Sequence, residues 1–417
     1  MKNIKNFFSF VFSISPRVII ELFNQFTALL SLPIIINTLN LSEYSFFTFI
    51  FFLSHLLFYL SNWGVQSHLS EEISKNNYNQ NKIIYFLLVF VTLCFSSCLI
   101  LLIILSLSYF TSLKFYITDF KIILLSLFFV LNMIFNPINI LHAMNLINKI
   151  LIPSIFNRIL FLFLIYYFRD SLDLKLIIFI FIISIFFINF YSFVLIFLKI
   201  KTFFQYKLSF ELQGIFKLIK KTKNSFTINF FNSFFLIFVS CMLIFKLQSA
   251  QLAVFNFLIQ LYRPGIALIE MTMRSLWQII LKSDRSARKS IIFIPITLIF
   301  IFLITSIYGE FLYIKVIYNY EYRALWPLVK VILYLLCLET IYYYLIFIAL
   351  YNLFRDLIKV EKIVLSSLFF HLIIIISILS FDLSVINIIV FYIFSKIAQI
   401  FFILFKTFKY ELRILKK

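Results

Sequence analysis

The residues of this chain best suited to chemistry are charged side chains that stand inside long apolar runs. A charge near the centre of a membrane-spanning helix costs about 2.5–3.5 kcal/mol, so such residues normally face the protein interior or water and have a partner. We therefore expect them to mark a binding or ion-coupling site. They are Glu21, Arg158, Arg263, Glu270, Lys330, Glu339 and Lys396, with His55 and His371 as titratable neighbours and Arg17 and Arg274 at the ends of runs.

Arg263 is the strongest candidate for substrate binding. It precedes Pro264 and Gly265, a pair that we expect to break or loosen its helix and to free backbone groups for a cavity. A guanidinium at such a break offers bidentate hydrogen bonds to a phosphate, so Arg263 is a candidate clamp for an anionic group. The alternative is a structural ion pair with Glu270, seven residues further along the same helix face.

The other in-span charges each have a plain structural alternative. Arg17 and Glu21 have the spacing of a local ion pair at the membrane interface. Arg158 can extend its head group to the cytoplasmic face. Lys330 and Glu339 could form a proton or ion coupling site, or could pack against each other within the second half of the chain.

Two further residues are interpreted from their surroundings in the sequence. Lys396 has no evident partner nearby, which favours a role facing a cavity. His55 belongs to a polar stripe and is a candidate proton-responsive group, although a hydrogen-bonded core histidine is the commoner case.

Catalytic and cofactor motifs are absent from the sequence. It has no glycine-rich phosphate loop, no paired His or Cys ligand spacing and no nucleophile elbow. The cysteines stand inside apolar runs and are expected to be small core residues rather than metal ligands. We therefore predict a protein that is not an enzyme and has no catalytic residues, no metal site and no cofactor. The four cysteines are Cys94, Cys98, Cys241 and Cys337.

Composition indicates what must position these residues. The chain has 417 residues, of which 63% are hydrophobic and 13% charged, with a mean hydropathy of +1.05. Apolar runs of about 20 residues recur, each long enough to cross a bilayer as a helix. The sequence predicts an all-α polytopic membrane protein without a removable signal peptide. We expect about twelve spans, at 18–39, 44–63, 83–109, 120–142, 150–168, 175–198, 224–246, 250–273, 290–313, 325–351, 363–381 and 383–405.

The basic residues predict the orientation. With the N-terminus inside, 26 Lys and Arg residues fall on the cytoplasmic side and 7 on the other, so both termini are expected in the cytoplasm. The same distribution explains the net charge of +20 without nucleic-acid binding. The most basic segment divides the chain into three predicted parts: an N-terminal six-helix lobe (1–198), a basic cytoplasmic linker (199–223) and a C-terminal six-helix lobe (224–417).

The two halves are related by an internal repeat. Sliding the chain by 208 residues aligns the first two spans with the seventh and eighth, and polar residues then coincide. In the second span of each half they recur at steps of 7, 7 and 4, within about 40° on one helix face. This predicts a parallel repeat of two lobes about an axis along the membrane normal. The coinciding pairs are Arg17 with Ser225, Glu21 with Asn229, Asn24 with Asn232, Thr48 with Asn256, His55 with Arg263, Asn62 with Glu270, and Gln66 with Arg274.

Two regions carry a resemblance to a known family. The first runs from Leu32-Pro33 through Leu41-Ser42-Glu43-Tyr44-Ser45 and Asn62-Trp63-Gly64-Val65 to Ser70-Glu71-Glu72-Ile73, and the second from Ile307-Tyr308-Gly309 to Tyr320-Glu321-Tyr322-Arg323-Ala324-Leu325. With the length, the twelve spans and the central basic loop, they resemble the Wzx-type flippases for lipid-linked oligosaccharides. That family belongs to the multidrug/oligosaccharidyl-lipid/polysaccharide exporters. Ser45 stands where the family usually has Gly.

The resemblance implies a fold and an activity. The fold would be two MATE-like six-helix lobes around a central cationic cavity that opens alternately to each side of the membrane. The substrate would be an undecaprenyl-diphosphate-linked repeat unit of O-antigen or a similar surface polysaccharide, in lipopolysaccharide or capsule. The expected cavity residues are Arg17, Glu21, Asn24, His55, Asn62, Asn232, Asn256, Arg263, Glu270 and Arg274, with Arg158, Lys330, Glu339 and Lys396 as possible coupling or cavity charges.

The same reading places the protein in the bacterial inner membrane. It would act as a monomer, with the polymerase and chain-length proteins of its pathway as candidate partners. Two other functions stay open. One is a membrane enzyme, such as an O-antigen polymerase or a lipid-sugar glycosyltransferase. The other is a drug or lipid II exporter of the same fold.

Overall fold

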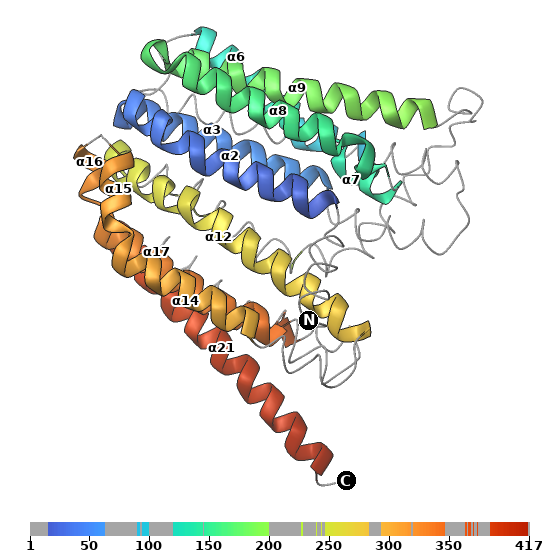
Figure 1. Cartoon of the computed structure of the whole chain (residues 1–417), viewed down its shortest axis with the longest axis vertical. Coiled ribbons are helices and arrows are strands. Elements are labelled where there is room, and N and C mark those ends of the chain that lie inside the picture. Colours follow the sequence, from blue (N-terminus) through green and yellow to red (C-terminus); the bar gives the residue numbers. More distant parts are fainter. Residues whose placement is uncertain are drawn as a thin grey trace, which may run out of the picture. The chain divides into compact units, whose positions relative to one another are not determined.

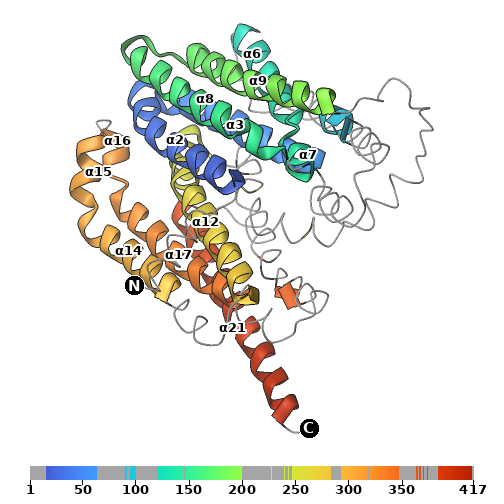
Figure 2. The same cartoon turned by 45° about the vertical axis from the view of Figure 1, so that its right-hand side comes forward.

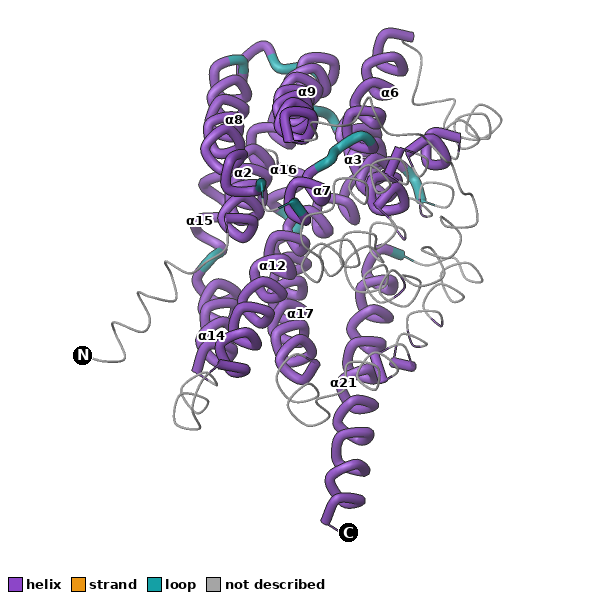
Figure 3. Tube along the Cα trace, turned by 90° about the vertical axis from the view of Figure 1, so that its right-hand side faces the viewer, coloured by secondary structure: helices purple, strands orange, loops and turns teal. Residues whose placement is uncertain are grey.

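The chain forms helices throughout the part that the computed structural model describes, and no strand occurs in that part (Figure 3). The described residues are 16–62, 90–91, 94–99, 120–144, 146–199, 227, 239, 243, 247–282, 293–317, 320–346, 363–364, 366–367, 370, 373 and 384–415. The chain divides into two compact units, Met1–Phe226 and Thr227–Lys417. Apart from Lys199, the predicted basic linker lies outside the described residues.

The helices of unit 1 (Met1–Phe226) pack in two connected groups (Figure 1). α3, α6 and α9 contact one another, α2 packs along α8, and α8 packs along α9. The described elements of this unit are α2 (Pro16–Thr38), α3 (Leu41–Asn62), α6 (Phe120–Ile134), α7 (Ile138–Ala143), α8 (Ile147–Tyr167), the 3-10 turn η2 (Arg169–Ser171) and α9 (Leu174–Lys199).

Local sequence explains where α3 begins. Asn40 precedes its first residue and accepts a hydrogen bond from the Glu43 backbone N–H at 2.9 Å, while the Asn40 N–H donates to the Glu43 carboxylate at 3.2 Å. This reciprocal capping box satisfies two backbone donors at the helix start. Asp173 similarly accepts a hydrogen bond from the Leu176 N–H and caps α9. Both helices therefore start at positions that polar side chains define.

Unit 2 (Thr227–Lys417) is built around α17. α12, α17 and α21 contact one another, and α14 lies along α17 (Figure 2). Its described helices are α12 (Ser249–Lys282), α14 (Phe293–Tyr308), α15 (Glu310–Val316), α16 (Tyr320–Arg323), α17 (Trp326–Tyr344) and α21 (Val385–Leu415). α15 turns away from α14 by 66° at Gly309.

The apolar helices confirm a polytopic membrane protein. Six described helices are long and apolar enough to cross a membrane, or seven if α14 and α15 form one bent span. The predicted spans 18–39, 44–63, 150–168 and 175–198 match α2, α3, α8 and α9 within three residues. The predicted spans 83–109, 224–246 and 363–381 lie mostly outside the described residues, so the number twelve stays a prediction.

Several predicted boundaries were wrong. The fourth span is divided at Asn136-Pro137 into α6 and α7, because proline cannot donate the backbone hydrogen bond that a continuous helix needs. The expected break at Pro264 does not occur, and α12 continues to Lys282. Neighbouring residues in a packed bundle can compensate for one missing backbone donor. The expected span 290–313 bends at Gly309, and α21 continues ten residues beyond 405.

Gly265 has a packing role in the uninterrupted α12. A Cβ atom at this position would lie 2.5 Å from Leu336 Cδ1 of α17. The missing side chain therefore lets α12 and α17 approach closely. The Pro264-Gly265 pair predicted a loosened helix, but α12 is continuous here and packs closely against α17.

Candidate functional site

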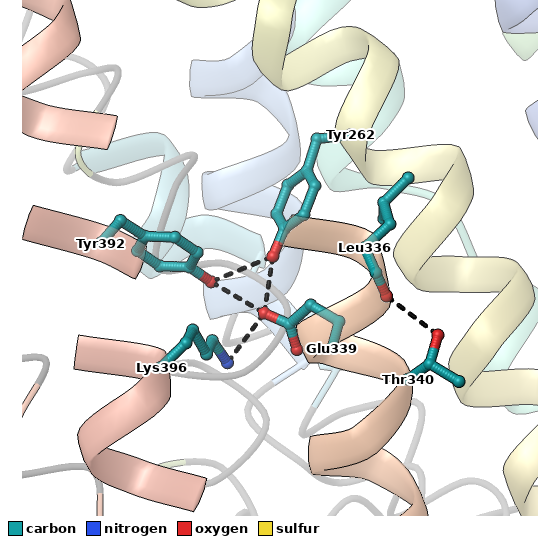
Figure 4. Close-up of polar contacts among 6 residues, drawn as sticks. All are labelled: Tyr262, Leu336, Glu339, Thr340, Tyr392 and Lys396. Carbon is teal, nitrogen blue, oxygen red and sulfur yellow. Dashed lines mark hydrogen bonds and ion pairs between the residues drawn. The ribbon is translucent and has the colours of Figure 1, made fainter. Parts of the chain in front are cut away.

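The centre of unit 2 holds a buried ion pair (Figure 4). Lys396 Nζ of α21 lies 3.0 Å from Glu339 Oε1 of α17, and each side chain is 1% exposed. Two charges this far from water are stable only if each compensates the other and further hydrogen bonds satisfy the remaining polar atoms. The pair thus joins α17 and α21. Removal of either residue alone would leave the other as an unpaired buried charge.

Two tyrosine hydroxyls complete the surroundings of the same carboxylate oxygen. Tyr262 of α12 donates a hydrogen bond to Glu339 Oε1 at 2.6 Å, and Tyr392 of α21 donates one at 3.3 Å. The two hydroxyl oxygens lie 3.4 Å apart. Hydrogen bonds to an ionised acceptor are stronger than neutral ones. One carboxylate oxygen therefore connects all three mutually packed helices of this unit.

Two aromatic rings face the ammonium group. Lys396 Nζ lies 4.2 Å from the ring centroid of Tyr342 and 5.7 Å from that of Tyr392, so both rings offer cation–π attraction. Gln399, one turn further along α21, is fully buried, and within the described part of the chain neither its amide oxygen nor its amide nitrogen has a hydrogen-bond partner. Buried polar groups are normally paired, so this amide has unused capacity to bind water or a polar group.

Helical spacing explains how these side chains meet. Tyr392, Lys396 and Gln399 follow one another at steps of four and three on α21, and Glu339 and Tyr342 are three apart on α17. Residues at these steps share one face of a helix. On α12, Tyr262 lies in the stripe that packs into the unit, with Ile269 and Met273, all of them fully buried. We call the five residues in mutual contact, Tyr262, Glu339, Tyr342, Tyr392 and Lys396, the Glu–Lys cluster.

The partners of Lys330 and Glu339 differ from those expected. Lys330 Nζ lies 3.6 Å from Glu310 Oε2 of α15, and both side chains are at least one third exposed. Glu339 pairs instead with Lys396, for which the sequence offered no evident partner. Of the two alternatives left open for Lys330 and Glu339, their mutual pairing does not occur, because Lys330 pairs with Glu310 and Glu339 with Lys396.

Arg158 has a defined contact inside unit 1. Its Nε donates a hydrogen bond to Asn24 Oδ1 at 2.7 Å, across the packed helices α8 and α2. Arg158 and Asn24 are both half-buried. The structure thus brings together two predicted candidates from spans one and five.

The polar stripe of the second span is placed differently in the two units. His55 Nδ1 lies 2.8 Å from the Phe51 carbonyl oxygen, and its ring lies 4.3 Å from the Phe51 ring. On α12, Asn256 is buried, whereas Arg263 and Glu270 are half-buried. Arg263 directly follows the fully buried Tyr262, and Glu270 directly follows the fully buried Ile269. Consecutive residues lie about 100° apart round a helix, so both charged residues lie at the edge of the packed face.

The remaining candidates are only partly placed. Arg17 and Glu21 belong to α2, Asn62 to α3 and Arg274 to α12, but their side chains lie outside the described residues. Asn232 lies outside them entirely. In the part of the chain that is described, no three His, Cys, Asp or Glu residues gather as a possible metal site.

Sequence reasoning missed the three tyrosines and Gln399. Tyrosine is common here, with 23 in the chain, so single positions gave no signal. A usable signal existed for the ion pair: a buried lysine needs a counter-ion, and Glu270 and Glu339 were the in-span acids of its own half. Tyr392, Lys396 and Gln399 also share one helix face in the sequence.

In comparisons with known proteins, the chain matches no family model, no curated protein and no solved structure. Its function is therefore inferred from its own sequence and geometry.

Proposed function

We propose that this membrane protein is a transporter made of two repeated six-helix lobes, which moves its substrate by alternating access. The observation that carries the proposal is a helix arrangement present in both units. In unit 1, α3, α6 and α9 contact one another, as α12, α17 and α21 do in unit 2. Their first residues, 41 and 249, 120 and 326, and 174 and 385, are 208, 206 and 211 positions apart. These offsets agree with the 208-residue shift that aligns polar residues of the two halves.

A pair of cysteine contacts supports the same correspondence. The Cys94 thiol of the third predicted span donates to the Ile134 carbonyl of α6 at 3.4 Å. The Cys337 thiol of α17 donates to the Ile299 carbonyl of α14 at 3.8 Å. In a twelve-span repeat these are spans three and four, and spans nine and ten, so corresponding neighbours are in contact in both lobes. A parallel repeat is the architecture of several secondary transporters.

The proposed substrate is an undecaprenyl-diphosphate-linked oligosaccharide, which the protein would flip from the cytoplasmic to the periplasmic leaflet. This choice rests on the resemblance of residues 32–73 and 307–325 to the polysaccharide-export flippases. Arg158, oriented by Asn24, and the half-buried Arg263 are the described cations suited to a diphosphate, because guanidinium binds phosphate oxygens in pairs.

The decisive experiment locates the lipid-linked repeat unit in a bacterial strain lacking this protein. A glycosidase that cannot cross the membrane would be applied to spheroplasts. We expect the units to be protected in the cytoplasmic leaflet, and a plasmid copy of the gene to restore their digestion. Single units that reach the outside without being polymerised would contradict the flippase and point to a polymerase.

Arg263→Ala tests the diphosphate clamp in the same assay. We expect surface glycan to be lost while the variant stays in the membrane at the normal level. Arg169→Ala is the matched control, since Arg169 is an exposed arginine beside Asp170 on η2. Normal surface glycan in the Arg263 variant would exclude the clamp.

A further inference from the structure

We propose that the C-terminal end of α21 is a binding surface for anionic phospholipids. The surface, which we call the α21 lipid surface, combines an apolar stripe with a basic stripe beside it. The inference goes beyond the proposed function and does not depend on it, since it concerns one helix and the membrane around that helix. The six residues of the surface are Leu404, Phe405 and Phe408 in the apolar stripe and Lys406, Lys409 and Arg413 in the basic stripe.

The first argument is the length of α21. Its apolar span ends at Phe408, but the helix continues to Leu415 (Figure 1). The 24 residues of the span cover about 36 Å, which already exceeds a hydrocarbon core of about 30 Å. The whole helix of 31 residues is about 46 Å long, close to the thickness of a bilayer with its headgroups. The last turns of α21 therefore lie at the level of the lipid phosphates.

The second argument is that α21 leaves the packed core of unit 2 before it ends. Ile403 is fully buried, and it is the last buried residue among the described side chains of α21. After it, Leu404, Phe405, Lys406 and Phe408 are all exposed. The described part of the chain does not cover these side chains, so lipid or another molecule must surround them.

The third argument is the order of residues along these turns. The three apolar residues of the surface lie within five positions, at the spacing of one helix face, and Leu412 continues them four residues further. Consecutive residues lie about 100° apart round a helix, so a residue that directly follows an apolar one lies beside the apolar stripe. A helix with this pattern places its apolar stripe among acyl chains and its basic stripe at the phosphates. Each basic residue has such a position: Lys406 follows Phe405, Lys409 follows Phe408, and Arg413 follows Leu412.

The fourth argument is the sign and density of the charge. Residues 406–417 contain five Lys or Arg residues and a single acid, Glu411. Lys406 is exposed, and its Nζ lies 5.3 Å from the ring centroid of Phe402, one turn earlier. This cation–π contact orients the side chain and leaves ammonium donors for a phosphate oxygen. Four or more basic residues beside a membrane span attract anionic headgroups. The ligand assigned to this surface is therefore a phospholipid of net negative charge, such as phosphatidylglycerol.

Basic residues at helix ends also have a simpler role, which is to orient a membrane protein during insertion. That role requires only the charge. A binding surface requires in addition that anionic lipids gather around this helix in the folded protein. The two roles therefore differ in a quantity that can be measured, namely the lipid composition next to α21.

The test measures which lipid lies next to α21 in the purified full-length protein. A chain without its own cysteines receives a single Leu412→Cys reporter, labelled with bimane, in nanodiscs of equal parts phosphatidylcholine and phosphatidylglycerol. One or the other lipid carries bromine on its acyl chains near the headgroup, where it quenches a neighbouring bimane. We expect phosphatidylglycerol to quench about twofold more than phosphatidylcholine. The difference should disappear in about 1 M salt, which screens charges beyond about 3 Å.

A triple variant with a matched control tests the basic stripe. Replacing Lys406, Lys409 and Arg413 together with Gln should make quenching by the two lipids equal, whereas Lys315→Gln should keep the preference. Lys315 is a suitable control because it is an exposed lysine of the same unit, and its Nζ lies 4.1 Å from the ring centroid of Phe311, also one turn earlier.

A second reporter tests whether the preference is local to α21. Phe300 is exposed on α14, a helix without acidic or basic residues. A Phe300→Cys reporter should therefore be quenched equally by the two lipids. A preference of the same size at this position would show that anionic lipid gathers around the whole protein, which would overturn a specific surface on α21.

The remaining outcomes are equally decisive. Equal quenching of the Leu412→Cys reporter at low salt would overturn the lipid surface and favour an acidic protein as the partner of α21. A preference that survives in the triple variant would also overturn it. Removal of the preference by inorganic phosphate at constant ionic strength would show a site for free anions instead. The salt and phosphate measurements need only the reporter chain, so they decide the question even if the triple variant does not fold. None of them uses the lipid-linked substrate, so this surface and the flippase can fail separately.

Discussion

At the scale of single residues, the chain depends on one buried charge compensating another. Removing one partner of a buried pair leaves the other unpaired and typically costs about 3–5 kcal/mol, whereas replacing both with apolar residues is often neutral. Glu339 and Lys396 meet the conditions of that rule, because both are 1% exposed. Each residue is therefore needed mainly to compensate the charge of the other, and the pair as a whole adds little stability compared with two apolar residues.

This dependence gives a prediction for stability. We expect Lys396→Met to destabilise the detergent-purified protein by about 3–5 kcal/mol, and the double variant with Glu339→Leu to recover most of that loss. Thermal unfolding of the wild type, both single variants and the double variant measures the coupling. The exposed Lys330–Glu310 pair is the matched control, and its removal should change stability by about 1 kcal/mol or less. A double variant as unstable as the sum of the singles would contradict mutual compensation.

The sequence predicted the members of this site better than their pairing. The cost of charge in a membrane was enough to single out Glu339 and Lys396, along with Lys330, which pairs elsewhere with Glu310. It could not pair them, because the pairing depends on how α17 and α21 are rotated against each other. The tyrosines were hidden by composition, since an aromatic position in an aromatic-rich chain says little about hydrogen bonding.

At the scale of elements, two glycines permit contacts of different rigidity. A Cβ at Gly309 would overlap the Thr305 carbonyl oxygen and would lie 3.0 Å from Trp326 Cη2. A backbone oxygen cannot move aside without disturbing α14. At Gly265 the obstacle is the end of the Leu336 side chain, which can rotate. The bend between α14 and α15 is thus more strictly dependent on glycine than the contact between α12 and α17.

This difference can be measured with matched substitutions. We expect Gly309→Ala to lower stability by about 1–3 kcal/mol and Gly265→Ala to lower it by less. Thermal unfolding in one detergent gives the comparison. In addition, Leu336→Ala should relieve Gly265→Ala, so that the double variant loses less than the two singles together. Equal losses at the two glycines would show that the Thr305 carbonyl is not the limiting contact.

Helix positions were predictable where the apolar run and the helix coincide. α2, α3, α8 and α9 are examples, and polar caps at Asn40 and Asp173 explain two of their starts. Proline was the less reliable signal. Pro137 ends a helix, while Pro264 lies inside one. The difference comes from tertiary packing, because α12 lies against α17 next to Pro264. The local sequence around a proline does not show such packing.

At the scale of the whole molecule, each unit contains three helices that contact one another, and different side chains fill the two contacts. Aromatic rings fill the contact in unit 1, and an ion pair with tyrosines fills the contact in unit 2. The 208-residue shift predicts such a pair of helix contacts from polar positions along the chain, and the repeat itself stays a prediction. The difference in filling could not be anticipated, since it depends on which side chains meet at depth.

The proposed repeat makes a prediction about topology. In a parallel repeat with both termini inside, α15 would lie on the periplasmic side and the end of α9 in the cytoplasm. We expect Leu312→Cys to react with a membrane-impermeant maleimide in intact spheroplasts. Lys199→Cys should react only after permeabilisation. Both reporters would be made in the chain without its own cysteines. The opposite pattern would reverse the orientation, and reaction of both positions in intact cells would exclude the parallel repeat.

The ion pair also has a consequence for synthesis. Glu339 leaves the ribosome before Lys396, so α17 enters the membrane while its counter-ion has not yet been made. During that interval the carboxyl must be protonated, be held by Tyr262 of the earlier α12, or remain near the insertion machinery. The arrival of α21 then supplies the ammonium that compensates the Glu339 carboxylate. The ion pair of this unit is therefore completed only by a helix that follows α17 in the chain.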